Sequence, residues 1–171
     1  MSIHDGLLLV RLVFGLMMAA HGAQKLFGWF GGYGIAATGG YFESIGFRPG
    51  RLFATAASLG EFISGLLIAL GFLGPIGPAL MLSVMIVAAI SVHWKHGLFS
   101  TSNGIEVPLL YAAVGTALAL TGPGLYSIDA LAGLSSLWTP AISWAVLVIG
   151  ILGAIVNLAL RRPVAQTAAA H

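Results

Sequence analysis

Ionisable side chains lie inside the apolar segments of this sequence, where they could do chemistry away from water. In the first apolar segment, Arg11, His21 and Lys25 recur at helical spacing. At 100° per residue, these three side chains fall within an arc of about 80° on one helix face. An ionisable side chain inside a membrane costs from about 3 kcal/mol upward, so it usually faces other protein segments. The stripe therefore predicts a face directed toward the interior of a helical bundle.

Glu61 stands in the second apolar segment, on a helix face whose other members are all small: Ala54, Ala57, Ser58, Ser64 and Gly65. Small residues mark the faces where membrane helices approach closely, so Glu61 is expected in a helix–helix seam. Its predicted depth lies between those of His21 and Arg11, and we expect its carboxylate to contact one of them or another polar residue of the cluster. The pair could fix packing only, or it could form a proton-handling or ligand-binding site.

The third apolar segment ends in SVHWKHG, which places His93 and His96 three residues apart on one helix face. That spacing permits two metal ligands, and Glu106 is a candidate third ligand. The alternatives are histidines at the membrane interface beside Trp94, and a capping box between Asn103 and Glu106. The metal site therefore stays an alternative to proton handling by His93.

The stretch HGAQKLFGWFGG, residues 21–32, combines hydrogen-bond donors with glycines and aromatics. Gln24 and Lys25 could form polar walls of a shallow pocket. Trp29 and Phe30 could line an apolar slot, or they could belong to an aromatic belt at the membrane surface. Residues 28–51 are expected to form a Gly/aromatic loop over the mouth of this pocket.

The amino-acid composition indicates which kind of secondary structure carries these residues. Hydrophobic residues make up 58% of the 171 residues and charged residues 7%, whereas soluble domains carry about 25% charged residues. Apolar runs long enough to cross a bilayer recur along the chain. The sequence predicts an all-α integral membrane helical bundle, a single transmembrane domain over 1–171, with helices at about 6–27, 52–72, 78–95, 105–121 and 141–160.

The connecting segments carry fewer signals. Ser127 is a predicted helix N-cap, with Asp129 as a favourable acid in the first turn of a short interfacial helix. Residues 161–171 are expected to form a flexible tail.

Lysines and arginines predict the orientation of the bundle. Outside the spans they flank the first loop, the end of the third helix and the end of the fifth, which lie on one side of a five-span bundle. The positive-inside rule then places the N-terminus outside and the C-terminus in the cytoplasm. The chain has no cysteine and only twelve charged side chains, which excludes a thiolate centre of its own and argues against nucleic-acid binding.

The stretch VRLVFGLMMAAHGAQKLFGWFGG resembles the DoxX family of small bacterial membrane proteins. The resemblance continues through GEFISGLLIALGF, VHWKHGLFSTSNGIEVPLL and TGPGLYSIDAL, and covers about residues 7–133. It implies a four-helix core, here followed by a fifth C-terminal transmembrane helix, in the bacterial cell (inner) membrane. The recurrent polar positions of the family correspond here to Arg11, His21, Gln24, Lys25, Glu61, His93 and Glu106.

The resemblance also implies oxidoreduction, because related DoxD-type chains are membrane subunits of thiosulfate:quinone oxidoreductase. We therefore expect a quinone-linked membrane subunit, with Glu61, His21 and His93 handling protons. The residues expected to bind the substrate are Arg11, Gln24, Lys25, Trp29, Phe30 and Glu106. The alternatives are a non-catalytic scaffold or carrier of a small apolar molecule, and the metal site of His93, His96 and Glu106.

The chain itself shows no evident redox centre or cofactor motif, so electrons would come from a partner protein or a bound group. The expected partners are the lipid bilayer, a soluble or membrane-bound oxidoreductase, and a second copy of the chain.

Overall fold

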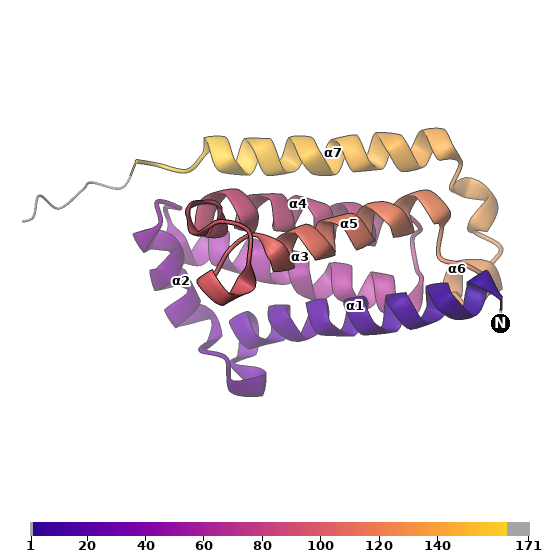
Figure 1. Ribbon diagram of the computed structural model, residues 1–171, viewed down its shortest axis with the longest axis horizontal. Coiled ribbons are helices and arrows are strands. Elements are labelled where there is room, and N and C mark those ends of the chain that lie inside the picture. The colour runs from indigo at the N-terminus through magenta and orange to yellow at the C-terminus, as the bar shows by residue number, and fades with distance from the viewer. Residues whose placement is uncertain (1, 164–171) are drawn as a thin grey trace, which may run out of the picture.

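The computed structural model describes residues 2–163 and is built from helices (Figure 1). It contains seven α-helices and, within the described residues, no strand, as the all-α prediction requires. The helices are α1 (Ile3–Phe27), α2 (Gly34–Ser44), α3 (Gly50–Leu70), α4 (Ile76–Ala88), α5 (Glu106–Thr121), α6 (Ile128–Leu131) and α7 (Pro140–Ala159). Most of the predicted flexible tail, residues 164–171, lies outside the described residues.

Four helices are long and apolar enough to cross a membrane. They are α1, α3, α7 and the continuous helix Ile76–His96, in which α4 is extended by a π-helical segment, Ala89–His93, and a 3₁₀ turn, Trp94–His96. Helix α5 has 16 residues, which gives about 24 Å, less than a bilayer core of about 30 Å. The chain is a multi-pass membrane protein.

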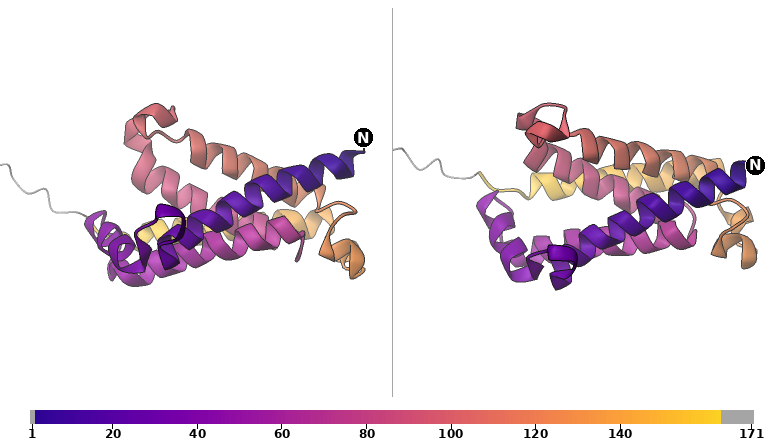
Figure 2. Two further views of the ribbon diagram at one scale, coloured as in Figure 1. Left: turned by 90° about the horizontal axis from the view of Figure 1, so that it is seen from below. Right: turned by 60° about the horizontal axis from the view of Figure 1, so that its bottom comes forward.

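Helices α1, α3, α4, α5 and α7 alternate in direction, so the start of α1 and the end of α7 lie at opposite ends of the bundle (Figure 1). Helix α3 packs against α1, α2 and α4, while α4 also packs against α5 and α7. Helix α2 lies steeply across one end of the bundle (Figure 2), which we call the α2 end. The short helix α6 caps the opposite end, called here the α6 end.

Glycines set the close approach of α1 and α3. A Cβ atom added at Gly22 would lie 2.5 Å from the backbone nitrogen of Phe62, and one at Gly15 would lie 2.6 Å from that of Ala69. Neither distance is sterically possible, so only glycine permits this spacing. The small-residue face predicted for α3 is the face that packs, because Ala54, Ser58 and Ser64 are all buried.

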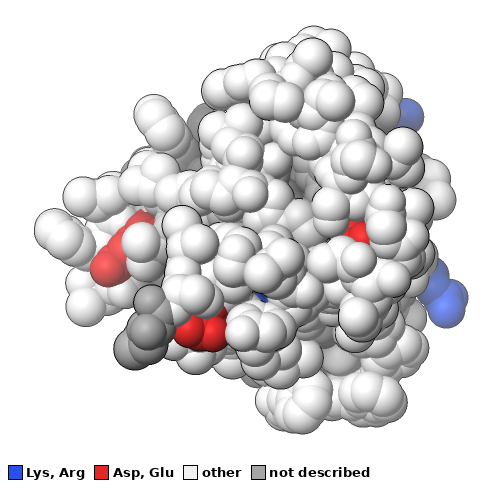
Figure 3. Space-filling view, turned by 90° about the vertical axis from the view of Figure 1, so that its right-hand side faces the viewer, with Lys and Arg blue, Asp and Glu red and all other residues white. Residues whose placement is uncertain are grey.

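Basic side chains gather at the α2 end. Lys25 lies in the last turn of α1, Lys95 lies in the last turn of the helix Ile76–His96, and Arg161 and Arg162 follow α7. In the view onto the α6 end, by contrast, most of the surface is uncharged, acidic patches interrupt it, and blue atoms show mainly near its right-hand edge (Figure 3). The bundle is therefore electrostatically asymmetric along its axis.

One element departs from the prediction. Residues 28–51 were expected to form a loop, but Gly34–Ser44 is helix α2, packed against α3. A Cβ atom at Gly39 would lie 3.0 Å from the Cα of Arg51. The glycines of this stretch thus allow close helix packing, which compensates for their low helix propensity.

Candidate functional site

An ion pair between Lys25 and Glu61 lies at the centre of the candidate site. Lys25 comes from the last turn of α1, and Glu61 comes from the middle of α3. Helical side chains lean toward the N-terminus of their own helix. In these antiparallel helices Lys25 therefore leans inward from the α2 end, Glu61 leans outward, and the two groups meet. The expectation that Glu61 contacts a polar residue of the first helix is confirmed, with Lys25 as the partner.

The two partners differ in burial. Glu61 is 2% exposed, whereas the Lys25 side chain is 36% exposed. The ammonium group of Lys25 donates to Glu61 Oε1, while Oε2 is buried without a hydrogen-bond partner among the described residues. Leaving a buried acceptor unpaired costs about 1–3 kcal/mol, more if charged. The open acceptor therefore points to a further partner, such as a water molecule or a ligand.

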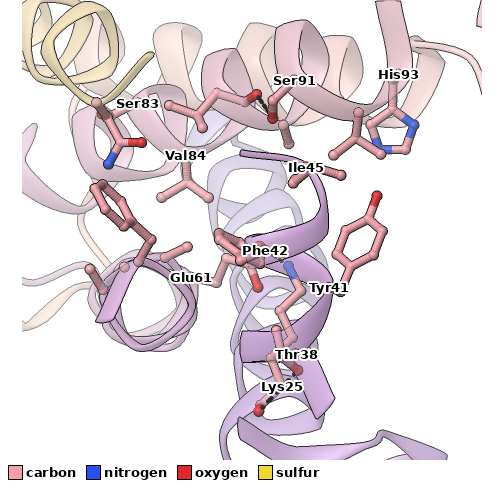
Figure 4. Close-up of a pocket in the computed structure, with 18 of the residues that line it drawn as sticks. Lys25, Thr38, Tyr41, Phe42, Ile45, Glu61, Ser83, Val84, Ser91 and His93 are labelled. Carbon is pink, nitrogen blue, oxygen red and sulfur yellow. Dashed lines mark hydrogen bonds and ion pairs between the residues drawn. The ribbon is translucent and has the colours of Figure 1, made fainter. Parts of the chain in front are cut away.

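A cavity of about 650 Å³, the main groove, begins at this ion pair (Figure 4). Helices α3 and α7 both pack against α4 but make no extensive contact with each other. The space between them is therefore open on one side and closed on the other by α4, which forms the floor of the groove. Most of the lining is apolar, and its residues come from α2, α3, α4 and α7. They include Phe42, Ile45, Phe53, Ala57, Leu80, Val84, Val87 and Gly153, with Ser83 and Asn157 as polar positions.

A second cavity of about 340 Å³, the side cavity, lies on the other side of the ion pair. It is lined by His21 and Met18 of α1, Tyr111 of α5, and residues Ser100 and Asn103 of the connection before α5. Both cavities share four lining residues: Lys25, Glu61, Ala88 and His93. The ion pair and His93 thus stand between an apolar compartment and a more polar one.

His93 ends the π-helical segment of the helix Ile76–His96. Such local widening of a helix is frequent at functional sites. Its Nδ1 lies 2.8 Å from the carbonyl oxygen of Asn103. A carbonyl can only accept, so Nδ1 donates, and in the neutral ring Nε2 is left as an acceptor. The structure therefore holds His93 in a tautomer that can take up a proton at Nε2.

Helix α2 supplies one wall of the main groove, which the sequence analysis did not predict. Thr38, Tyr41, Phe42 and Ile45 face the groove opposite the α4 residues (Figure 4). Partial burial raises the pKa of the Tyr41 phenol, against a smaller lowering by Arg161, so Tyr41 is a neutral hydroxyl at physiological pH. These four residues follow i, i+3, i+4, i+7 spacing, the signal that could have identified this wall from the sequence.

The predicted roles of Gln24, Trp29 and Phe30 in the pocket are not supported by their positions. Gln24 Nε2 donates to the carbonyl of Phe30 at 3.1 Å, which holds the turn after α1. Trp29 and Phe30 are 56% and 70% exposed, and none of the three lines either cavity. The turn after α1 is exposed, and residues of α2 line the main groove in its place.

Arg11 also lies away from the site, contrary to its predicted role in binding substrate. It is buried at the α6 end, where its Nη2 donates to the carbonyl oxygen of Tyr126. Glu106 accepts a hydrogen bond from the backbone nitrogen of Ser100 at 2.7 Å and lines neither cavity. The alternative ligand set of His93, His96 and Glu106 is not assembled, because no three His, Asp or Glu side chains are placed to hold a metal within residues 2–163.

His21 and His93, by contrast, lie beside the ion pair. Both line the side cavity next to Glu61. The ring of His21 packs edge-on against Tyr111, with 6.2 Å between ring centroids.

Comparison with known proteins adds a family. The model of the DoxX family matches residues 6–94, which is more than half of the chain. The matched segment runs from α1 to the end of the π-helical segment, so it contains Lys25, Glu61 and His93. No curated protein and no solved structure matched the chain.

Proposed function

The chain belongs to the DoxX family, and we propose that it is a quinone-binding membrane subunit of an oxidoreductase in the bacterial inner membrane. One observation carries this proposal. The main groove ends on Glu61, whose buried Oε2 has no partner among the described residues. An apolar groove that ends on an open hydrogen-bond acceptor suits a molecule with an apolar body and a hydroxyl-bearing end, such as a quinol.

The size and lining of the groove fit such a molecule. Small-molecule sites typically enclose about 300–1,000 Å³ and have mostly apolar walls with a few polar groups. The main groove encloses about 650 Å³. A quinone tail would lie over the floor formed by α4, between α3 and α7, and its ring would lie near the ion pair. Burial of ring and tail would supply most of the affinity.

The polar end of the main groove has hydrogen-bond donors for a quinone and hydrogen-bond acceptors for a quinol. The Lys25 ammonium donates to Glu61 and has two further N–H groups for a quinone carbonyl. Glu61 Oε2 and His93 Nε2 can accept hydrogen bonds from quinol hydroxyls. The bound quinone supplies the redox chemistry, and the residues of the chain hold it and exchange its protons. His21 and His93 line the side cavity, which offers these protons a route toward the α2 end.

A binding experiment on the full chain tests the proposal. The probe is a quinone with a decyl tail in its reduced, quinol form, compared with decylbenzene, which keeps the tail and lacks the oxygens. We expect Gly153→Leu to weaken quinone binding at least about tenfold, because a Cβ there meets only Ser83 Oγ, at 3.7 Å, so the larger side chain enters the groove. Ala145→Leu, an exposed position on α7 outside the groove, is the matched control.

Glu61→Gln reports on the polar end. Glu61 Oε2 accepts a hydrogen bond from a quinol hydroxyl, and one such bond contributes about 1 kcal/mol, so this change should weaken binding of the quinol probe about fivefold and leave decylbenzene unaffected. Equal affinity for the two probes, with no effect of Glu61→Gln, would show an apolar carrier instead. Unchanged quinone binding by Gly153→Leu would refute the groove as the site.

We also infer that the α2 end faces the cytoplasm. All six lysines and arginines outside the α1 interior lie at this end, which the positive-inside rule assigns to the cytoplasm. A C-terminal alkaline phosphatase fusion should be inactive, and a C-terminal green fluorescent fusion should be bright. The reverse pattern would contradict the assignment.

A further inference from the structure

A third cavity lies at the α2 end, between α2, the turn after α4, and the C-terminal end of α7. It encloses about 700 Å³, and we call it the basic vestibule. Its lining includes four basic residues: Lys95, His96, Arg161 and Arg162. No Asp or Glu is among its described lining residues, so the cations around it are not neutralised locally.

Part of this basic wall is held in place by the fold. Arg161 Nε donates to the carbonyl of Ile45 at 2.6 Å, and its guanidinium carbon lies 6.0 Å from the centre of the Phe47 ring. The backbone nitrogen of Arg162 donates to the carbonyl of Gly46 at 2.8 Å. The terminal nitrogens of Arg161 have no partner among the described residues. They are therefore available to an anion, and the side chain is already fixed.

The surroundings of the vestibule are those of a lipid headgroup. It adjoins α7, whose exposed face carries large apolar residues including Ile151, Leu152, Ile155 and Val156. Acyl chains can lie along that face while a phosphate lies at its C-terminal end. Tyr41 and Ser44 also line the vestibule, so hydroxyl groups stand beside the cations.

From this arrangement we propose that the basic vestibule binds the phosphate of an anionic phospholipid whose acyl chains lie along α7. Basic pockets between membrane helices on the cytoplasmic side suit such headgroups. The lipid is favoured over free phosphate because the site joins a cationic end to an apolar helix face. The basic residues that carry this proposal line the vestibule and not the main groove, although Tyr41, Ile45, Ser91 and Val92 line both. Lys25 and Glu61 do not line the vestibule, so the variants below leave the proposed quinone contacts in place.

The test uses the full chain in detergent, with native mass spectrometry of bound lipid. The probes are phosphatidylglycerol and phosphatidylcholine with the same acyl chains, supplied in equal amounts. The test variant is Lys95→Gln/Arg162→Gln, because neither side chain makes a hydrogen bond among the described residues. The matched control is Arg48→Gln/Arg51→Gln, which removes the same charge at the same end from positions outside the vestibule.

We expect the wild type and the control to bind phosphatidylglycerol in preference to phosphatidylcholine. In the test variant, the ratio of bound phosphatidylglycerol to bound phosphatidylcholine should fall about tenfold. Equal loss in both variants would show diffuse surface electrostatics and overturn the proposal, as would no loss in the test variant. Displacement of the lipid by millimolar inorganic phosphate would show a site for soluble phosphate and overturn the lipid assignment. The variant Lys95→Gln alone, expected to lose about half of the effect on a logarithmic scale, serves if the double variant does not fold.

Discussion

Replacing Lys25 with methionine tests the ion pair, because the two partners are buried to different extents. Methionine keeps most of the length of the lysine side chain and removes its charge. Glu61, at 2% exposed, would then hold a buried carboxylate without the one hydrogen-bond partner it has among residues 2–163. In the reverse change, Glu61→Gln, the Lys25 ammonium is already 36% exposed and can turn toward water. The structure therefore predicts an asymmetric loss of stability.

The magnitudes follow from this difference in burial. Removing one partner of a buried pair costs about 3–5 kcal/mol. Since Lys25 is partly exposed, we expect Lys25→Met to lower the free energy of unfolding by about 3 kcal/mol. Glu61→Gln keeps the shape and should cost about 1 kcal/mol, the net contribution of one hydrogen bond. The double variant should cost less than Lys25→Met alone, because no charge remains stranded.

The free energies can be measured by reversible unfolding in mixed micelles, followed by circular dichroism. Lys95→Met is the matched control, since Lys95 is exposed and forms no ion pair among the described residues. It should change stability by less than about 0.5 kcal/mol. If Glu61→Gln proves as costly as Lys25→Met, or if the two single changes add in the double variant, the reasoning from burial is wrong.

Two further predictions concern packing and the α6 end. Gly22→Ala should destabilise the protein by about 1–3 kcal/mol in the same assay, because its Cβ would overlap the backbone of α3. Gly6→Ala, where no atom lies within 4 Å, should not destabilise it, and equal effects would contradict the α1–α3 seam. Asp129→Ala should destabilise by at least about 2 kcal/mol and shift the Trp138 fluorescence, because it removes the acceptor of the indole and of two backbone N–H groups. A Trp138 spectrum unaltered by that change would show that this network does not form.

The sequence by itself determined the elements and the class of the protein. A chain with 7% charged residues cannot cover a water-facing surface, and within a bilayer a run of about 20 apolar residues satisfies its backbone as a helix. The five predicted long helices correspond within a few residues to α1, α3, the continuous helix Ile76–His96, α5 and α7. The spacing of small residues around Glu61 also identified the buried face of α3, because periodicity in one helix is a local property.

The partner of Glu61 was decided by the tertiary structure. Periodicity shows which face of a helix is buried, but it does not fix how far one helix is displaced along another. That displacement depends on where glycines such as Gly22 let the backbones touch. It brings Lys25 to Glu61 and leaves Arg11 at the far end, against the predicted role of Arg11 in the pocket.

Helix α2 shows the same limit of local reasoning. The three glycines of this helix, Gly34, Gly39 and Gly40, favoured a loop, yet Gly39 is where its backbone packs against the start of α3. Burial against a neighbouring element outweighs local propensity, and only the assembled fold reveals that neighbour. The groove wall that α2 supplies was therefore missed, although its spacing was present in the sequence.

Ser127 and Asp129 show the difference between what local sequence predicts and what the tertiary structure decides. Ser127 is the N-cap of α6, as predicted from local pattern, and its hydroxyl accepts from the backbone nitrogen of Ala130 at 3.2 Å. Asp129 was expected to be a first-turn acid only. In the structure it is buried and accepts hydrogen bonds from the backbone of Leu73 and Gly74, more than fifty residues away. Capping depends on neighbours in the chain, whereas these bonds depend on the end of α3 and the start of α6 meeting in space, which the packing of the whole bundle decides.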